Sequence, residues 1–600
     1  MKLVCRMKIT FSWMITCLSI VLAGCVSAGV SAGGSAKSEV LLEVEGLNSG
    51  SIQTMPAVAS VNGSPAVLYA TIDNRIVFQR GDQKLFLDTD APVKGGNRFQ
   101  LNAGRDRMYA QWWSHEKAKN LYFTSTTDAG TTFSPVSIVN DAHGILSPIT
   151  FLQHSNGAIG MTYHDERAPR FQAYFNRSTD NGLTWGRPDQ RLDSPSADGS
   201  SSYVTEPQSV EAENAWVTAW VDSITVLGKT TNRILATKSD DAGLSWSAPQ
   251  VLFESEQHIA SLNIKASGSL VVVAADENER GIVAFVSNDK ASNWRSAGVL
   301  DGTAAPVGSS GASISGLRMA LSEGSAHLVW MAEYKGIKTR IMRGRLNLTD
   351  VRWQAGAERL DVKQYENSQS TLPTILSTKG GALVAAWVDY RHIRPTIYIS
   401  SSVDKGQSWA DPRPLEQPGM LSLGLPSLMQ WGNDAAIAYQ SYPSDRIQEG
   451  KFILRLLPVT ASGVVTPKLA SSTPLDDAAR KERLVQRVKE FWQSRIKDDY
   501  KVSYGMFDFA YRAQVSEKQY LASVGVMTFL AFEQPDVEIN GNEATVKAKV
   551  RYEVPENTLP NGKKIKLDAT DADTVSTWVW IGDNWYFVFK PSPGEPTLKY

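Results

Sequence analysis

Cysteine is scarce: the 600-residue sequence has three, Cys5, Cys17 and Cys25, and all of them lie in the first 25 residues. A disulfide framework and a cysteine-based metal site are therefore excluded from the rest of the chain. The seven histidines are scattered, without the spacing that holds zinc on a helix. Neither a glycine-rich phosphate loop nor a Gly-x-Ser-x-Gly nucleophile turn occurs. We expect no cofactor and no metal.

Long hydrophobic runs and an excess of either charge are also missing. The main apolar segment, residues 9–23, is shorter than the about 20 residues of a transmembrane helix. The 61 basic and 62 acidic residues leave a formal charge of −1, which gives no general attraction to nucleic acid. Apolar residues make up 42%, too many for a disordered polar chain. A chain of 600 residues is expected to form several domains or one long repeat array.

The N-terminus has the layout of an export signal, with basic residues before the apolar segment and small residues after it. Residues Leu22-Ala23-Gly24-Cys25 resemble the lipobox of bacterial lipoproteins. This resemblance implies a signal peptide over residues 1–24, cleavage before Cys25, and acylation of Cys25, palmitate included. A secretory signal cut at an Ala-x-Ala-like site further on is the alternative. Translation from Met7 would also leave a complete signal.

Several acyl chains on one residue anchor a protein firmly in a membrane. Residue 26 is Val and not Asp, which by resemblance to lipoproteins of Gram-negative bacteria favours the outer membrane. Residues 25–38 are rich in Ala, Gly and Ser and are interpreted as a flexible tether. We expect a lipid-anchored protein of the cell envelope, and the face of the membrane stays open.

One eight-residue pattern recurs, Ser/Thr-x-Asp-x-Gly-x-Ser/Thr-aromatic, with clear copies at residues 126–133, 178–185, 239–246 and 402–409. A degraded copy spans residues 287–294, and a barely recognisable one ends at Trp353. The closing aromatics are 48 to 61 residues apart, a period typical of propellers and solenoids. The defining residues are Asp128, Gly130, Phe133, Ser178, Asp180, Gly182, Trp185, Ser239, Asp241, Gly243, Trp246, Asp289, Trp294, Ser402, Asp404, Gly406 and Trp409.

Each copy follows a strand pattern and has the chemistry of a turn. Its Asp and its Ser or Thr can bond backbone amides, its Gly supplies a positive φ, and its aromatic can pack between sheets. The pattern resembles the Asp boxes of sialidases and of other Asp-box (BNR repeat) propellers. The resemblance implies a mainly β fold with a sialidase-like β-propeller of seven or eight blades over residues 39–465. It also implies that the boxes are structural staples between strands three and four of a blade.

A second repeat lies upstream of the boxes, where an apolar strand ends in an aromatic residue and then an acid, as in residues 163–165, 220–222 and 387–389. These acids are spaced 57, 54, 57 and 56 residues apart, which argues for equivalent positions at the end of the second strand. Eight blade-like units can be counted between residues 55 and 458, and the strand pattern at residues 40–44 is expected to join the last unit and close the ring. The repeated acids are Asp165, Asp222, Asp276, Glu333 and Asp389.

These acids open the loops between second and third strands, which we expect around one mouth of the propeller channel. A concave mouth that gathers acids, arginines and aromatics is the default binding site. The acids themselves are interpreted as mainly structural, because one acid in each blade is too regular for a catalytic site. The candidate residues of the ligand face are Glu166, Asp222, Asp276, Arg280, Glu333 and Asp389.

An enzymatic interpretation stays open. Resemblance to sialidases implies an arginine clamp on a carboxylate, a tyrosine nucleophile and an aspartic acid that donates a proton. The Arg-Ile-Pro signature of that family is missing, because the nearest segments, residues 74–77 and 97–99, lack the proline. The candidate residues are Arg167, Arg280, Arg391 and Arg394 for the clamp, Tyr390 or Tyr334 as nucleophile, and Asp165 as acid.

The pattern changes near residue 470. A helix is expected to start at Thr473-Pro474, with a shorter helix at residues 516–523 and two hairpins that turn at Asn540-Gly541 and at residues 582–584. This order resembles the nuclear transport factor 2-like (SnoaL-like) α+β fold over residues 474–592. The resemblance implies an accessory, dimerisation or ligand-binding module, in which Asp499 and Asp508 are the candidates for catalysis.

Taken together, the sequence predicts an envelope protein whose propeller binds a glycan or a protein ligand without catalysis. Two alternatives remain. One is an exo-alpha-sialidase or a related glycoside hydrolase, and the other is a scaffold in an outer-membrane assembly. No nucleic-acid partner is expected, since the net charge and the motifs give no reason for one.

Overall fold

The computed structural model describes residues 37–588 apart from residues 48–54, 89–95, 105–106, 115–118, 143, 168–170, 194–200, 279, 303–311, 335–336, 362–368, 393, 418–420, 444–449, 468–476, 509–510, 513–514, 559–563 and 582–583. The side chains of residues 96, 145–148, 201–202, 312, 334, 337–338, 392 and 443 are not described either. The predicted signal peptide, Cys25 and the side chain of Tyr334 therefore lie outside the described residues. Within the described part, no helix is long and apolar enough to cross a membrane.

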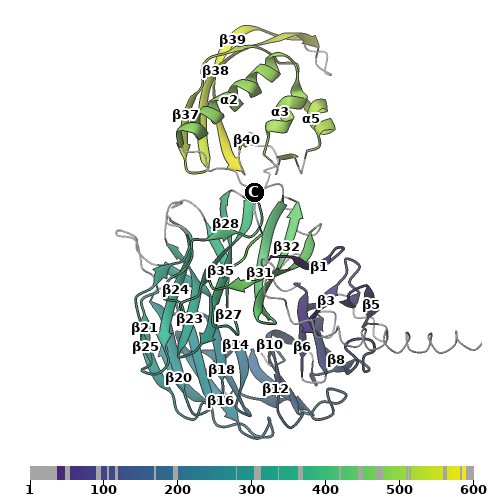
Figure 1. Ribbon diagram of the computed structural model, residues 1–600, viewed down its shortest axis with the longest axis vertical. Coiled ribbons are helices and arrows are strands. Elements are labelled where there is room, and N and C mark those ends of the chain that lie inside the picture. The colour runs from purple at the N-terminus through teal and green to yellow at the C-terminus, as the bar shows by residue number, and fades with distance from the viewer. Residues whose placement is uncertain are drawn as a thin grey trace, which may run out of the picture. The chain divides into compact units, whose positions relative to one another are not determined.

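Eight antiparallel sheets of four or five strands follow one another through the described residues between 40 and 457 (Figure 1). The first to fourth sheets consist of β2 (Ala57–Val61), β3 (Ser64–Ala70), β4 (Ile76–Arg80), β5 (Gln83–Phe86); β6 (Gly96–Ala103), β7 (Met108–Ser114), β8 (Asn120–Thr126), β9 (Ser137–Ile138); β10 (Ile145–Gln153), β11 (Ile159–Asp165), β12 (Gln172–Ser178), β13 (Gln190–Arg191); and β14 (Ser201–Ala212), β15 (Ala215–Val226), β16 (Lys229–Ser239), β17 (Gln250–Ser255).

The fifth to eighth sheets consist of β18 (Ile259–Ser267), β19 (Leu270–Glu277), β20 (Gly281–Ser287), β21 (Arg295–Leu300); β22 (Ala312–Ser322), β23 (Ser325–Tyr334), β24 (Ile337–Asn347), β25 (Arg352–Trp353), β26 (Glu358–Arg359); β27 (Ser370–Ser377), β28 (Leu383–His392), β29 (Arg394–Ser402), β30 (Arg413–Pro414); and β31 (Leu421–Trp431), β32 (Asp434–Pro443), β33 (Lys451–Leu457), β1 (Val40–Val44). The eighth sheet takes its fourth strand from the start of the chain, because β1 pairs antiparallel with β33. The predicted pairing of residues 40–44 with the last unit is thus confirmed. A short hairpin of β34 (Val459–Thr460) and β35 (Gly463–Val464) follows.

Each sheet packs on its neighbours through apolar side chains that the two sheets share. Phe78 of the first sheet and Leu101 of the second lie in one cluster, and Tyr69 of the first sheet lies in another with Phe452 of the eighth. Burying one such side chain contributes about 1.5–3 kcal/mol. First strands of successive sheets also contact one another. The succession of packed sheets therefore closes on itself.

The predicted box turns lie between third and fourth strands. In the third sheet, Ser178 Oγ accepts from the Gly182 amide at 2.9 Å and donates to Asp180 Oδ1 at 2.7 Å. Asp180 in turn accepts from the Thr184 amide at 2.9 Å. Gly182 has a φ of +85°, and a Cβ there would lie 2.0 Å from the Phe123 ring of the second sheet. The glycine is needed both for the turn and for the close approach of the next sheet.

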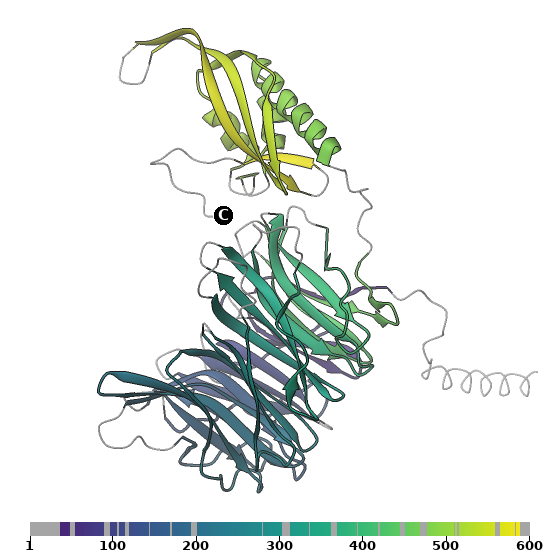
Figure 2. The ribbon, with the colours of Figure 1, turned by 90° about the vertical axis from the view of Figure 1, so that its left-hand side faces the viewer.

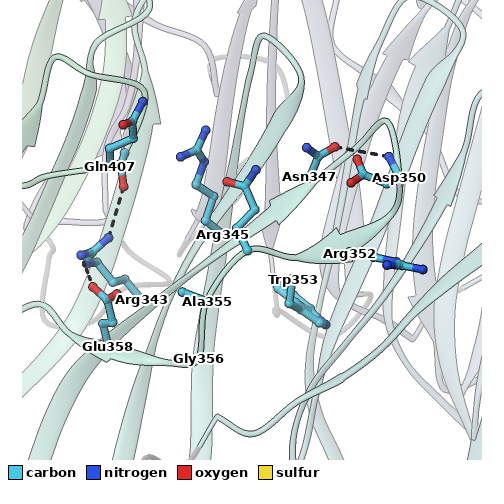
Figure 3. A pocket seen from close by; sticks show the side chains of 12 residues that line it. Arg343, Arg345, Asn347, Asp350, Arg352, Trp353, Ala355, Gly356, Glu358 and Gln407 are labelled. Atoms are coloured by element: carbon cyan, nitrogen blue, oxygen red, sulfur yellow. Dashed lines mark hydrogen bonds and ion pairs between the residues drawn. The ribbon is translucent and has the colours of Figure 1, made fainter.

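The degraded box of the fifth sheet shows how this packing can change. Ala291 takes the glycine position with a φ of +63°. The fourth sheet has Ala236 at the position where the second and third sheets have Phe123 and Phe175, and Ala236 and Ala291 share one apolar cluster. The smaller neighbour leaves room for the added methyl group. The sixth sheet instead has a groove at this turn, which is described below (Figure 3).

The described residues 477–588 form a sheet with helices against one face (Figure 2). The elements are α2 (Asp477–Ile496), α3 (Tyr500–Met506), α5 (Glu517–Ser523), β36 (Thr528–Phe532), β37 (Asp536–Asn540), β38 (Glu543–Thr558), β39 (Lys564–Ile581) and β40 (Asn584–Val588). Phe491 and Trp492 of α2 lie in one cluster with Val546 of β38 and Trp578 of β39. Both predicted hairpins are confirmed, since β37 pairs with β38 and β39 with β40. The predicted helix start at Thr473 lies outside the described residues.

Candidate ligand-binding cavity

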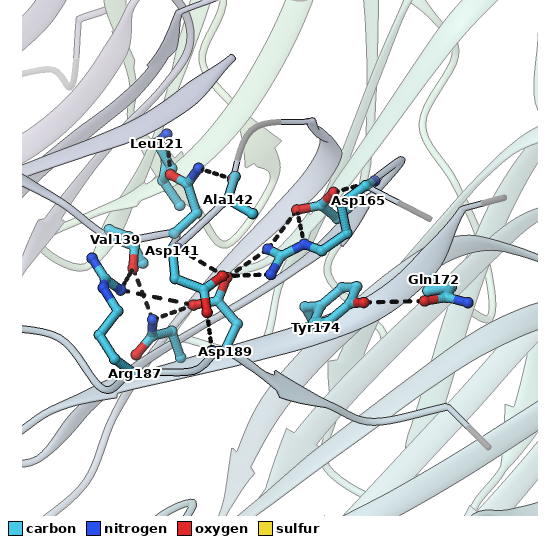
Figure 4. A network of polar contacts seen from close by, with 12 residues as sticks. Leu121, Val139, Asp141, Ala142, Asp165, Gln172, Tyr174, Arg187 and Asp189 are labelled. Atoms are coloured by element: carbon cyan, nitrogen blue, oxygen red, sulfur yellow. Dashed lines mark hydrogen bonds and ion pairs between the residues drawn. The ribbon is translucent and has the colours of Figure 1, made fainter. Parts of the chain in front are cut away.

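Arg167, a predicted clamp residue, follows β11 and pairs with three carboxylates, those of Asp141, Asp165 and Asp189, which Figure 4 labels. Its guanidinium lies 2.6 Å from Asp165 Oδ2 and 2.5 Å from both Asp141 Oδ1 and Asp189 Oδ2. The ring of Tyr174 lies beneath it, with its centroid 4.2 Å away. Burial lowers the pKa of Arg167, but the hydrogen bonds with Asp165 and Asp189 raise it more. This side chain fixes its own loop and the neighbouring turns.

Arg391 repeats that geometry in the seventh sheet. Its amide and Nε donate to Asp389 Oδ1 at 2.9 and 2.8 Å, and its Nη2 donates to Oδ2 at 2.5 Å. Trp387 and Ser370 also donate to Asp389, and the Tyr398 ring centroid lies 3.8 Å from the guanidinium carbon of Arg391. Asp-x-Arg is thus a local clasp in both loops, at Asp165 and at Asp389.

Arg394 points to the C-terminal elements instead. Its Nη2 lies 3.2 Å from Asp508 Oδ1, and both side chains are buried. Asn542 Nδ2 donates to the carbonyl of Arg391 at 2.9 Å. The predicted clamp arginines are therefore each bonded to different acids, and Asp508 is bonded to one of them.

The other predicted residues have individual surroundings. Asp222 pairs with Arg233 across the fourth sheet at 2.7 Å, and Arg280 lies 3.2 Å from Glu277. Tyr390 is 37% exposed. Glu166 pairs with Lys119, and Glu333 is exposed.

Asp276 differs from Asp165, Asp222 and Asp389 because no arginine pairs with it in the described part of the chain. Its side chain is buried, and its Oδ1 accepts from the amides of Ala260 and Ser261 at 2.8 and 2.7 Å. Among the described residues, its Oδ2 has no hydrogen-bond partner. Burial raises the pKa of Asp276 to about 6.

The first strands carry a feature that sequence reasoning missed. Seven of them, β6, β10, β14, β18, β22, β27 and β31, shift register against their second strands near their beginnings. At five of these bulges one residue has a positive φ of 52–66°: Arg98, Glu206, Gly316, Leu372 and Leu425. Bulges re-aim side chains and often adjoin functional sites, and non-glycine residues held at positive φ cost of order 1–3 kcal/mol each.

Four of these five residues line one cavity of about 380 Å³. Residues of the first, seventh and eighth sheets, such as Pro56, Leu372 and Pro426, make an apolar wall, and Arg98 and Arg318 also line this cavity, which we call the inner cavity. The inner cavity therefore combines an apolar wall with cationic groups, which is the usual composition of a small-molecule site.

The charges of the inner cavity are not balanced by ion pairs. Arg98 Nε and Nη1 are buried and have no hydrogen-bond partner among the described residues, while the Trp113 ring centroid lies 5.3 Å from its guanidinium carbon. Burial lowers the pKa of Arg98, Arg318 and Lys265, and the charge of Arg318 lowers that of Lys265 further. Burial raises the pKa of Glu206, and the charges of Arg318 and Arg98 lower it. Two of these cations, Arg98 and Arg318, thus act on one acid whose ionisation burial disfavours.

Few features of the sequence predict the inner cavity. Arg98 lies in the Asn97-Arg98-Phe99 segment that lacks the sialidase proline, and Arg318 belongs to no motif. The one usable signal is a residue-Pro pair within the first strands, at Ser147-Pro148, Glu206-Pro207, Leu372-Pro373 and Leu425-Pro426. A proline is confined to strand edges and bulges, so these pairs mark the distorted positions.

Residues 107–322 match the family model described as BNR repeat-like domain. No curated protein matches this chain in sequence. Among solved structures, the NanB sialidase from Streptococcus pneumoniae is 9% identical and covers 70% of this chain and 92% of its own, with a TM-score of 0.31. An alpha-L-arabinanase of Penicillium chrysogenum is 14% identical (54% and 94% coverage, TM-score 0.32). An ulvan lyase is 13% identical (61% and 93%, TM-score 0.37).

Proposed function

We propose that this chain is an eight-bladed propeller that binds an acidic saccharide in its inner cavity without catalysis. The eight sheets that close on themselves and the BNR repeat match support the propeller. The observation that carries the ligand class is Arg98, whose buried Nε and Nη1 have no protein partner among the described residues. Buried polar groups are nearly always satisfied, and Arg98 is the one arginine among the described residues with two buried donors that lack a partner, so these donors point to a bound acceptor.

A carboxylate fits these donors, because Nε and Nη1 each form one fork of the guanidinium together with Nη2. Arginine binds a carboxylate through two parallel hydrogen bonds, and Arg318 supplies a second cation in the same cavity. The apolar wall around Leu372 and Pro426 suits the carbon face of a sugar ring. A volume of about 380 Å³ lies at the lower end of ligand sites, which suits one or two sugar units.

The surroundings of the predicted clamp favour binding over sialidase chemistry. Arg167 and Arg391 are bonded to Asp165 and Asp389, so their forks are not offered to a ligand. The lipobox-like segment at residues 22–25 supports an anchor at the cell envelope, which would present this cavity to envelope or environmental glycans.

The test uses the mature protein and titration calorimetry with glucuronic acid, N-acetylneuraminic acid and their neutral counterparts. We expect binding of an acidic sugar that weakens at least tenfold in Arg98→Met and in Arg318→Met, while the matched surface variant Lys229→Met binds as the wild type. A neutral sugar that binds equally well would overturn the ligand class. Turnover of a fluorogenic sialoside that Arg98→Met abolishes would overturn the absence of catalysis.

A further inference from the structure

The sixth sheet has no box where five other sheets have one. Residues 346–353 read Leu-Asn-Leu-Thr-Asp-Val-Arg-Trp. They can be aligned with the box of the third sheet through one backbone hydrogen bond that both turns make. The Gln354 amide donates to the Arg345 carbonyl at 3.0 Å, just as the Gly186 amide donates to the Arg177 carbonyl at 2.9 Å. Leu346 and Leu348 therefore occupy the places of the box serine and aspartate. Both are buried in the cluster shared with the fifth sheet. This turn has no box carboxylate to hold its amides.

Polar side chains lie on the face of this turn opposite Leu346 and Leu348. Side chains alternate along a strand, so Arg343, Arg345 and Asn347 of β24 lie on the face opposite Leu346. Asn347 Oδ1 accepts from the Thr349 amide at 2.8 Å, which replaces the box aspartate as the acceptor of the turn. Arg352 stands where the complete boxes have the hydroxyl that bonds the aspartate.

These residues line a groove of about 530 Å³ (Figure 3). We call it the sixth-sheet groove, and its lining is Arg343, Arg345, Asn347, Asp350, Arg352, Trp353, Gln354, Ala355, Gly356, Glu358, Gly406 and Gln407. Gly406 and Gln407 of this lining come from the box turn of the seventh sheet, and Ala355 and Gly356 are its small residues. Trp353 is held by its Nε1, which donates to the Gly298 carbonyl at 3.3 Å.

The groove carries more positive than negative side chains, and they are unequally engaged. Arg343 pairs with Glu358 and donates to the Gly406 carbonyl at 3.3 Å. Arg345 makes one weak bond, from Nε to Ser325 Oγ at 3.4 Å. In the described part of the chain, no ion pair is formed by Arg345 or Arg352. Two guanidinium groups therefore remain for an anion.

We propose that the sixth-sheet groove is a second binding site, for a carboxylated or sulfated oligosaccharide. Arg345 and Arg352 would bind the acid groups, the amides of Asn347 and Gln407 would bond hydroxyls, and Trp353 would contact a sugar face. The volume allows a longer ligand than the inner cavity does.

The two sites lie at different ends of the sixth sheet. Arg345 pairs with His327 on β23, whereas Met331, four residues further along the strand, lines the inner cavity. Four residues of a strand span about 13 Å. The second site is independent of the proposed function, and a chain with two acidic-sugar sites could bind two segments of one polymer.

The test uses the mature protein, a sulfated heparin-derived hexasaccharide and neutral maltohexaose, with affinity measured by calorimetry in low salt. We expect the sulfated probe alone to bind, and Arg345→Gln together with Arg352→Gln to weaken it at least tenfold. Lys405→Gln, which removes a neighbouring exposed cation of the seventh-sheet box, should change the affinity less than twofold.

Ala355→Trp provides a second variant that keeps every charge but fills the groove, and Ala355 is exposed, so the fold should tolerate the change. It should also weaken the sulfated probe at least tenfold. Unchanged affinity in this variant or in the double arginine variant would overturn the proposal, as would equal binding of maltohexaose or no binding of the sulfated probe. Loss of binding in Arg98→Met alone would place the probe in the inner cavity and would also overturn this second site.

Discussion

The arginines of the loops and the arginines of the inner cavity have opposite surroundings. Arg167 touches three carboxylates and Arg391 is clasped by Asp389, whereas no carboxylate pairs with Arg98 or Arg318 in the described residues. A buried charge costs several kcal/mol unless it is paired. The loop arginines therefore serve the fold, whereas Arg98, whose Nε and Nη1 are buried without a protein partner among the described residues, is maintained at a cost to stability that a ligand can offset.

The same contrast holds among the acids. Asp389 is clasped by Arg391, and although burial opposes ionisation, the bonds from that arginine lower the pKa of Asp389. Asp276 has two backbone amides but no cation, and its pKa rises to about 6. Asp389 and Asp276 occupy equivalent positions in the repeat, so the difference between their pKa values comes from the residue two positions later. This residue is Arg391 after Asp389 and Asn278 after Asp276.

The largest effect is expected for Arg167→Ala. Removing this guanidinium leaves Asp141, Asp165 and Asp189 close together without their shared cation, so the free energy of unfolding should fall by about 3–5 kcal/mol at pH 7. Urea denaturation measures the change. Lys229→Ala, whose pair with Glu256 is exposed, should cost less than about 1 kcal/mol. Equal losses in the two variants would break the contrast between loop and surface charges.

The next largest change in the free energy of unfolding is expected on neutralising Asp276 or Asp389, with opposite signs for the two acids. The folded pKa of Asp276 lies above that of a free aspartate, about 3.9, so its ionised form destabilises the fold above pH 6 and the penalty disappears as the pH falls toward 4. Asp276→Asn should therefore raise the free energy of unfolding at pH 8 by about 1–3 kcal/mol and change little at pH 4.

Asp389→Asn should do the reverse. The lowered pKa of Asp389 stabilises the fold above pH 4, and this contribution is lost as the pH falls through its folded pKa. The variant should be less stable than the wild type at pH 8, and the gap should narrow in acid. Denaturation curves at pH 8 and pH 4 compare the two variants, and a loss at pH 8 in both would contradict the assignment of Asp276 as an unpaired acid.

Arg391→Lys tests geometry apart from charge. Lysine keeps the positive charge but cannot make the two parallel bonds to Asp389 or stack as a plane on Tyr398. We expect a loss of about 1–2 kcal/mol in the free energy of unfolding. A lysine variant as stable as the wild type would mean that charge alone holds this loop.

The smallest effect on stability is expected for Arg98→Met. Methionine removes a buried cation that has no partner at Nε and Nη1 and adds apolar contact in the cavity. The free energy of unfolding should change by less than about 1 kcal/mol or rise, even though acidic-sugar binding is lost. A loss comparable to that of Arg167→Ala would show that Arg98 is structural.

The box turns were predictable because every interaction in them is local. Ser178, Asp180, Gly182 and Thr184 bond one another within seven residues, so spacing alone specifies the turn. The pairing of β1 with β33 was also predictable, because the unpaired backbone groups of an edge strand favour pairing with another strand. Asp-x-Arg could have been recognised in the same way, because Arg167 and Arg391 reach back two residues.

The sequence by itself therefore determined the features that depend on residues close together in the chain. These are the period of the repeat, the box turns, the strand patterns and the hairpins of the C-terminal sheet. The inner cavity was decided by the tertiary structure alone. Its lining residues, such as Arg98, Arg318 and Leu425, come from sheets separated by one hundred residues or more, and they meet because bulges turn them to the same space. The sixth-sheet groove also depends on the tertiary structure. Its turn lacks the box carboxylate, but the groove forms only because the box turn of the seventh sheet supplies Gly406 and Gln407 to its lining.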